Sequence, residues 1–370
     1  KFFMQITTSS VKDALLNVIE PDLKKSIIEL DLVQDIEIDG NKVSFKVKIA
    51  NPAMHSRKRM EEACVFQLER AFGKEVEVHI TTEGLPKDPE KKEQRKTLPG
   101  VKNIIAVASG KGGVGKSTIT TNLAAGLAKQ GFRVGLVDAD IYGPSAPTMF
   151  DVVGQRPQTI EIDGVKRINP IMAYGVKLLS IGFFTEVDKA VIWRGPMASK
   201  ALKQIINDAH WGELDYLLID LPPGTSDIHL SMVQNVPVSG AVIVSTPQEV
   251  ALVDARRGVD MFRQKEINVP ILGFVENMAW FTPEELPENK YYIFGRDGVK
   301  NLAEGMDIPL LGQIPLVQSL RESGDCGRPA VLQDKTSLSM AFDELVEELV
   351  TRVNWRNENL DRTRVVEMKS

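Results

Sequence analysis

The sequence predicts an α/β protein in which a doubly wound, mainly parallel sheet follows a small α+β domain. Three observations carry this prediction. From residue 101 onward, short apolar runs alternate with helix-like segments, the order that builds a parallel sheet covered by helices. A glycine-rich turn at residues 109–118 lies between the first of these runs and the first of these helices. Before residue 83, two alternating runs flank a turn, and helix-like stretches precede and follow them.

We divide the chain into four segments. A length of 370 residues suits two or three domains of ~100–200 residues each. Residues 86–96 carry charges of both signs, two prolines and almost no apolar side chain, which is typical of a solvated linker. The expected segments are a small α+β domain over 1–84, a charged linker over 85–98, the larger α/β domain over 99–353 and a charged tail over 354–370.

Composition restricts the class of protein. Hydrophobic residues make up 43% and charged residues 26% of the chain, values typical of a soluble globular protein. No apolar stretch approaches the ~20 residues that span a bilayer, and the start at Lys1 has no apolar core followed by a cleavage site, so we expect neither membrane binding nor a signal peptide. The net charge of −5 disfavours a nucleic-acid-binding surface. Two cysteines give no disulfide framework and indicate a reducing, cytoplasmic location.

In the small domain, apolar periodicity switches between helix and strand. Pro21 ends the first helical stripe, and the turn Asp39-Gly40-Asn41 joins two runs that alternate with a period of two. In chain order we expect a helix over 11–19, strands over 33–38 and 43–49, a helix over 60–72 and a strand over 76–80.

The glycine-rich turn has the spacing of a P-loop. Gly110 and Gly115 have four residues between them and precede Lys116 and Ser117, between a strand and a helix as the motif requires. The backbone N–H groups of such a loop bind nucleotide phosphates, and the following helix N-terminus assists them. Lys116 is expected to contact the β and γ phosphates, and the Ser117 hydroxyl to ligate Mg²⁺. The expected nucleotide-binding set is Gly110, Lys111, Gly112, Gly113, Val114, Gly115, Lys116, Ser117 and Thr118.

Aspartates end two of the apolar runs, at the edge where such sheets bind ligands. Asp138 and Asp140 follow the run 132–137, and Asp220 follows the run 214–219. An apolar strand that ends in Asp is the Walker B arrangement, so we expect Asp220 to hold Mg²⁺ directly or through a water. The alternative for each aspartate is a cap on the next helix or turn. The P-loop favours the functional interpretation.

The rest of the large domain supplies further core elements. The apolar runs 241–247 and 271–277 are expected to be core strands, and residues 158–184 an inserted hairpin region. Over 339–353 apolar residues share one helical face and acids the other. Because a membrane-bound helix favours Lys and Arg on its polar face, we expect this helix to pack on the domain.

Together these motifs resemble the Mrp/ApbC-type iron–sulfur cluster carriers, a family of MinD/ParA-like ATPases with a deviant P-loop. The resemblance covers nearly the whole chain, because residues 8–82 are similar to the small iron–sulfur-assembly-type domain that precedes many of these ATPases. It rests on Lys-Gly-Gly-Val-Gly-Lys-Ser at 111–117, Asp-Ala-Asp-Ile-Tyr-Gly-Pro-Ser at 138–145, Trp-Arg-Gly-Pro-Met at 193–197 and Asp-Leu-Pro-Pro-Gly at 220–224.

The resemblance implies roles for the catalytic residues. Lys111 matches the first lysine of the deviant P-loop, which reaches the nucleotide of the partner subunit, so the resemblance implies a nucleotide-sandwich homodimer. A solvated loop lysine is the alternative for Lys111. Asp140 matches the acid that orients the attacking water, Asp138 is implied to support the Mg²⁺ shell, and the catalytic set is Lys111, Lys116 and Asp140.

The resemblance also implies contacts to the rest of the nucleotide. Gly224 lies in the sequence similar to the second switch, where its N–H would sense the γ-phosphate. Asn277, at a strand end, resembles the residue that contacts the base. Pro315 belongs to a segment, 314–317, that resembles the loop closing over the purine. A polar residue at a strand end also serves turns, and this alternative stays open for the base contacts.

The cysteines depart from the family pattern. Carriers of this type normally continue from the Asn to a Cys-x-x-Cys pair, but residues 278–292 contain no cysteine. In the small domain Met54 stands where a thiol is usual, and Cys64 is expected to be a small core residue. Cys326 alone cannot build a four-thiolate site. The ligands of an iron–sulfur cluster therefore stay unknown, and Glu284, Glu285 and Glu288 are expected to form an exposed acidic turn.

The function expected from these features is that of an ATP-binding, ATP-hydrolysing iron–sulfur cluster carrier or assembly protein that acts as a homodimer with Mg²⁺. Iron–sulfur apoproteins or assembly factors are its expected partners. The alternative is a metal-free, nucleotide-dependent scaffold or switch that binds an assembly partner, which the missing Cys-x-x-Cys favours. A positioning ATPase of the ParA/MinD type is disfavoured by the acidic charge balance and the acidic tail helix.

Overall fold

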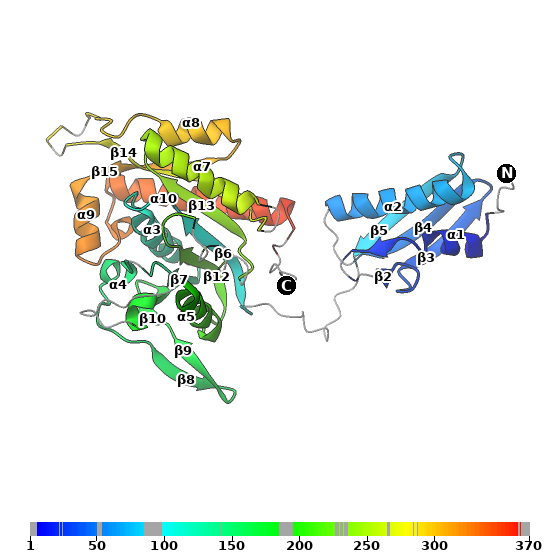
Figure 1. Ribbon diagram of the computed structural model, residues 1–370, viewed down its shortest axis with the longest axis horizontal. Coiled ribbons are helices and arrows are strands. Elements are labelled where there is room, and N and C mark those ends of the chain that lie inside the picture. Colours follow the sequence, from blue (N-terminus) through cyan, green and yellow to red (C-terminus); the bar gives the residue numbers. More distant parts are fainter. Residues whose placement is uncertain are drawn as a thin grey trace. The chain divides into compact units, whose positions relative to one another are not determined.

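The computed structural model describes residues 6–21, 23, 25–49, 54–84, 98–141, 143–184, 195–225, 229, 232, 236–264, 267–283, 285–286, 288–361 and 363. These residues form two compact units, one over 6–84 and one over 98–358, which Figure 1 shows. The expected linker lies outside the described residues except at its last position. The last seven residues of the expected tail, and the tryptophan and arginine of the Trp-Arg-Gly-Pro-Met motif, also lie outside them.

The small unit packs two helices against one face of a three-stranded sheet. Its elements are α1 (Thr8–Leu15), β1 (Ile19–Glu20), β2 (Lys25–Ser26), β3 (Val33–Asp39), β4 (Lys42–Ile49), α2 (Met54–Phe72) and β5 (Glu77–Gly84). β4 pairs antiparallel with β3 and parallel with β5. The predicted hairpin is confirmed, with Gly40 at φ 59° in its turn. The first helix begins and ends earlier than expected, and Ile19 and Glu20 pair with β2 instead of continuing it. Cys64 is fully buried in the core, as expected.

The large unit is built on an eight-stranded sheet. Its strands are β6 (Val101–Ala108), β7 (Val134–Asp138), β10 (Ile171–Ala173), β11 (Val176–Ser180), β12 (Leu214–Asp220), β13 (Gly240–Ser245), β14 (Ile271–Phe281) and β15 (Leu310–Leu316). Their order is β10-β11-β7-β12-β6-β13-β14-β15. All pairs are parallel except β10 with β11, so the predicted doubly wound, mainly parallel sheet is confirmed.

Helices cover both faces of this sheet (Figure 1). The helical elements are α3 (Lys116–Lys129), α4 (Ala146–Met149), η1 (Ile181–Phe184), α5 (Gly195–Asp208), α7 (Glu249–Arg263), α8 (Gly298–Gly305), α9 (Gln318–Asp325), η2 (Ala330–Leu332) and α10 (Ser337–Asn359). α3 and α10 share one apolar core with one face of the sheet, and α5, α7 and α8 share the other. Since both faces are covered, the central strands are apolar without alternation.

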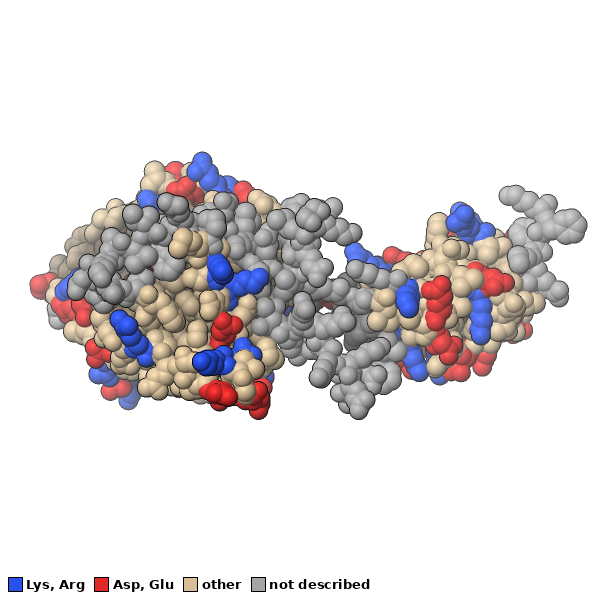
Figure 2. Space-filling model, turned by 60° about the horizontal axis from the view of Figure 1, so that its bottom comes forward, with Lys and Arg blue, Asp and Glu red and all other residues tan. Residues whose placement is uncertain are grey.

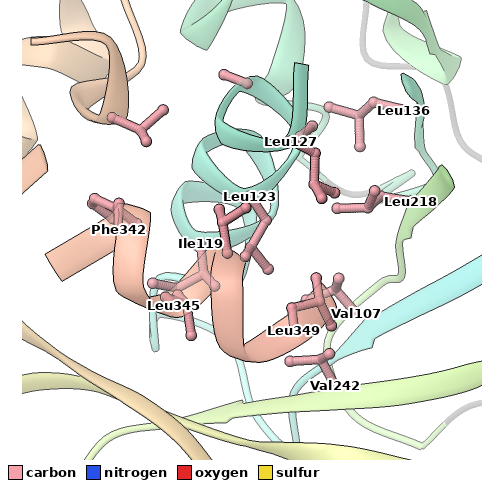
Figure 3. Close-up of a cluster of buried hydrophobic side chains, with 14 of the residues drawn as sticks. Val107, Ile119, Leu123, Leu127, Leu136, Leu218, Val242, Phe342, Leu345 and Leu349 are labelled. Atoms are coloured by element: carbon pink, nitrogen blue, oxygen red, sulfur yellow. The ribbon is translucent and has the colours of Figure 1, made fainter. Parts of the chain in front are cut away.

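The core around α3 fixes the helix that follows the glycine-rich turn. Figure 3 shows residues of α3, α10 and four strands meeting in one cluster: Val107, Ile119, Leu123, Leu127, Leu136, Leu218, Val242, Phe342, Leu345 and Leu349. The tail helix therefore packs on the domain, as expected. It runs past Val353 to Asn359, because Arg356 is buried and the Asn357 amide donates to Asn103. No described helix is long and apolar enough to cross a membrane.

Two expected elements differ in the structure. Residues 158–184 are only partly an inserted hairpin: β8 (Gln158–Ile162) and β9 (Val165–Asn169) form it, whereas β10 and β11 join the main sheet. β11 adds to the sheet because Val176, Leu178 and Leu179 are fully buried. The expected purine loop at 314–317 begins as strand, because residues up to Leu316 belong to β15. Pro315 fits there because β15 is an edge strand.

Candidate nucleotide site

The phosphate loop connects β6 to α3. The strand ends at Ala108 and the helix begins at Lys116, so the predicted strand–turn–helix is confirmed. Gly113 and Gly115 have φ of 82° and 81°, a left-handed conformation that favours glycine. The loop thereby turns from the sheet edge directly into the helix N-terminus, where free backbone N–H groups attract anions.

Gly110 lets this loop approach α7 closely. A Cβ atom at Gly110 would collide with the backbone of Asp254 in α7. A Cβ at Gly112, in contrast, would come no closer than 3.9 Å to its nearest neighbour, the Pro223 side chain. The two glycines therefore serve different purposes: Gly110 is needed for packing within the fold, whereas Gly112 leaves space above the loop.

Lys116 and Asp220 form a buried ion pair at the centre of the site. The Lys116 Nζ lies 2.6 Å from the Asp220 Oδ1, and the two side chains are 4% and 2% exposed. The Thr120 hydroxyl donates to the same carboxylate oxygen at 2.9 Å. The other oxygen, Oδ2, is buried and accepts no hydrogen bond from the described residues. A buried acceptor of this kind suits a cation or its water ligand.

Asp138 lies beside Asp220 on the neighbouring strand β7, at the same register. Its Oδ1 accepts from the Asp140 N–H at 3.2 Å, and its Oδ2 from the Ala146 N–H at 3.1 Å and the Ser180 hydroxyl at 2.9 Å. Burial raises the pKa of Asp138 to about 7, and the charge of Asp220 adds to the rise, while these hydrogen bonds oppose it. Through these hydrogen bonds, Asp138 holds the backbone at Asp140 and at Ala146, the first residue of α4.

Asp140 and Lys111 lie at the margins of this cluster. The Asp140 Oδ2 is 3.8 Å from the Lys116 Nζ, and its side chain is 13% exposed. Lys111 is half-buried, and its side chain makes no ion pair with any residue that the structure describes. The structure thus brings Lys116, Asp138, Asp140 and Asp220 together, whereas Lys111 forms no ion pair within the described part of the chain.

The predicted base and γ-phosphate contacts have partners of their own. The buried Asn277 donates from Nδ2 to the Val114 carbonyl at 2.8 Å, whereas its Oδ1 is buried without a hydrogen bond from the described residues. The Gly224 N–H donates to the Ser109 carbonyl at 2.9 Å, which ties the segment after β12 to the phosphate loop. Pro315 follows Ile314, the register partner of Asn277 on β15.

Comparison with known proteins identifies the family. Residues 100–350 match the family described as NUBPL iron-transfer P-loop NTPase. The chain belongs to this family. Residues 8–80 match a second family, described as iron–sulfur cluster assembly protein. The predicted resemblance to P-loop iron–sulfur carriers with a small N-terminal assembly-type domain is confirmed.

Relatives of this P-loop NTPase cover most of its length. An iron–sulfur cluster carrier protein of Synechocystis is 43% identical over 353 residues, which are 94% of this chain and 98% of that protein. The mouse iron–sulfur cluster transfer protein NUBPL is 43% identical over 283 residues, 76% of this chain and 84% of that protein.

Solved structures support the fold. A nucleotide-binding protein from Archaeoglobus fulgidus in complex with ADP is 38% identical with a TM-score of 0.55, covering 63% of this chain and 89% of that chain. MinD of Pyrococcus furiosus is 25% identical with a TM-score of 0.50, covering 67% and 98%.

The geometry fits an ATPase of this family that uses Mg²⁺. The phosphate loop, the helix N-terminus and Lys116 supply the positive field that phosphates require. Ser117 and Asp220 supply hydroxyl and carboxylate oxygens, the ligands that Mg²⁺ prefers, and the unpartnered Asp220 Oδ2 is one such oxygen. The chain is therefore an ATP-binding P-loop ATPase.

Sequence reasoning missed two residues of the site. Thr120 donates to Asp220 and lies one helical turn after Lys116, a spacing that places both on one helix face. Ser180 donates to Asp138 from the end of β11, a strand that the sequence analysis assigned to an insertion. The signal for Ser180 was available, because it ends a short apolar run as Asp138 and Asp220 do.

Proposed function

We propose that this ATPase carries iron–sulfur clusters to acceptor proteins and that ATP hydrolysis switches it between loading and release. The observation that carries the proposal is that one chain combines an assembly-type domain with a P-loop ATPase. The similarity to the Synechocystis carrier protein extends over nearly the full length of that protein. Iron–sulfur apoproteins or assembly factors are the proposed partners. The proposed domain limits are 1–84 and 99–353, and the two free cysteines support a cytoplasmic location.

In the proposed site, each residue of the buried cluster has one task. Lys116 contacts the β and γ phosphates, Ser117 and Asp220 hold Mg²⁺ with support from Asp138, and Asp140 positions the attacking water. Mg²⁺, when bound, neutralises charge on the phosphates. The short distance between Asp140 and Lys116 supports this division, because it places the acid beside the phosphate-binding lysine.

We propose that Lys111 acts across a homodimer. Lys111 is half-buried and forms no ion pair with the described residues, and the phosphates of a facing nucleotide would match its charge. In this arrangement Lys111 of one subunit stabilises the charge that develops during hydrolysis in the other. Hydrolysis would then depend on dimer formation.

Gly224, Asn277 and Pro315 are proposed to sense the rest of the nucleotide. For Gly224 to sense a γ-phosphate, its N–H must leave the Ser109 carbonyl, so the proposed switch exchanges one acceptor for another. Asn277 keeps a buried Oδ1 that accepts no hydrogen bond from the described residues. That oxygen is an acceptor for an amino group such as the one adenine carries.

The positions of the two cysteines favour a second candidate, a metal-free, nucleotide-dependent scaffold. Among the described residues, neither cysteine belongs to a group of three His, Cys, Asp or Glu side chains that could hold a metal ion. Cys64 is buried in the small unit, where burial raises the pKa of its thiol to about 12, and Cys326 is exposed in the large unit. A thiol with so high a pKa is a poor metal ligand at neutral pH.

Anaerobic reconstitution with iron and sulfide separates the two candidates. Wild type, Cys326→Ser and a Cys64→Ser/Cys326→Ser double variant are compared by absorbance, iron content and transfer to an apo-ferredoxin. Stoichiometric iron, about four per dimer for one [4Fe–4S] cluster, together with transfer from the wild type, supports carriage. No stoichiometric iron in the wild type, alongside normal ATP hydrolysis, contradicts carriage and leaves the scaffold.

A further inference from the structure

Ser180 ends β11 beside the carboxylate cluster, although neither the motifs nor the family match singles it out. β11, β7 and β12 run parallel, and their register aligns Ser180, Asp138 and Asp220 in one row at the carboxyl edge of the sheet. Ser180 is fully buried. A polar side chain in such a place requires hydrogen-bond partners.

The partners of Ser180 fix the direction of its hydroxyl. The Gly182 N–H donates to the Ser180 Oγ at 3.0 Å, so a lone pair of that oxygen is used. The hydroxyl proton then points to the Asp138 Oδ2 at 2.9 Å. Because the donor and acceptor sides are both set, Ser180 determines one orientation of the Asp138 carboxylate.

The orientation of Asp138 in turn sets the backbone that carries Asp140. With Oδ2 held by Ser180 and Ala146, the other oxygen faces the Asp140 N–H. Gly182 also lies close to this segment, because a Cβ at Gly182 would come within 3.1 Å of the Pro144 ring. Ser180 is thus two hydrogen bonds away from the backbone of the proposed water-positioning acid.

We propose that Ser180 is a positioning residue of the ATPase, which acts through Asp138 to hold Asp140 in place for hydrolysis. Ser180 itself touches neither Lys116 nor the phosphate loop through any described hydrogen bond. It is therefore expected to affect turnover and not nucleotide affinity. This role concerns ATP hydrolysis alone and does not depend on whether the protein carries a cluster.

Ser180→Ala tests this role, and Ser245→Ala is its matched control. Ser245 also ends a parallel strand of the same sheet and is 1% exposed, but among the described residues its hydroxyl donates only to the neighbouring Thr246 carbonyl, at 3.3 Å. Both variants remove one buried hydroxyl. Their melting temperatures show whether both are folded at the assay temperature, and Ser180→Cys, which keeps the volume but donates weakly, replaces Ser180→Ala if that variant does not fold.

The expected result is a kcat roughly 10-fold lower for Ser180→Ala, the usual loss for a supporting hydrogen bond around such a site. The dissociation constant of ADP should change by less than about twofold, and Ser245→Ala should resemble wild type. In ¹⁵N-labelled, nucleotide-free protein the amide signals of Asp140 and Ala146 should shift in Ser180→Ala and not in Ser245→Ala. A wild-type kcat in Ser180→Ala, an equal loss in Ser245→Ala, or a loss of kcat without the Asp140 shift would overturn the proposal.

Discussion

The Lys116 ammonium and the Asp220 carboxylate lie 2.6 Å apart, and both side chains are almost completely buried. They come from the first residue of α3 and the last residue of β12, 104 positions apart in the chain. The ion pair therefore joins the phosphate loop to the strand that supplies the proposed Mg²⁺ ligand. Each charge is stabilised largely by the other, because water is excluded from the pair.

Lys116 and Asp220 should contribute to stability as a pair. Lys116→Met and Asp220→Asn should each lower the free energy of unfolding by about 3–5 kcal/mol, since each leaves a buried charge without its nearest partner. In Asp220→Asn, Lys116 keeps only the longer ion pair to Asp140, at 3.8 Å, among the described residues. The double variant should lose clearly less than the sum. Urea denaturation of the nucleotide-free protein measures this coupling, and additive losses would mean that the pair contributes nothing as a pair.

Lys111→Ala should remove dimer-dependent hydrolysis and keep nucleotide binding. Turnover per chain is expected to fall roughly 10²–10³-fold, as for other fixed groups that stabilise developing charge, while ADP affinity changes little. Turnover measured against protein concentration checks this prediction. Lys203→Ala, which changes an exposed lysine of α5, is the control. Undiminished turnover in Lys111→Ala would exclude its action across a dimer.

Changing Gly110 and Gly112 of the phosphate loop to alanine should have different effects on stability and on nucleotide binding. Gly110→Ala should lower stability by about 1–3 kcal/mol, because its Cβ overlaps the backbone of α7. Gly112→Ala should leave stability within about 0.5 kcal/mol and weaken nucleotide binding, because its methyl group occupies the space above the loop. Thermal unfolding and ADP titration of both variants distinguish these effects. The reverse assignment would contradict the separate roles of the two glycines.

Asp215 should make the stability of the large unit depend on pH. Hydrogen bonds from Arg133 and then from Lys102 hold the pKa of Asp215 well below its usual range. Because this pKa is lower in the folded than in the unfolded chain, the stabilisation is present above about pH 4 and is lost as pH falls. Asp215→Asn should therefore cost more stability at pH 7 than at pH 3.

Urea denaturation at both pH values tests this dependence. Asp334→Asn is the control, because Asp334 is exposed and forms no ion pair with any residue in the described part of the chain. A loss in Asp215→Asn that does not change with pH would show that the ion pairs do not set its pKa.

Much of the site could be predicted because its signals are local. The spacing from Gly110 to Ser117 and the aspartates that end apolar runs require only neighbouring residues, so the sequence by itself determined the phosphate loop and the candidate acids. The same holds for the alternation of strands and helices, which set the fold class. The hairpin at Gly40 and the buried face of α10 were also evident from periodicity.

Only the tertiary structure decided which of these residues meet. Strand order places Asp138 and Ser180 in one row with Asp220. In the chain, residues 181–213 lie between β11 and β12. The buried partner of Asn277 and the close approach of Gly110 to α7 likewise depend on contacts across more than 100 residues. Such contacts arise from packing and register, which the period of a single strand does not encode.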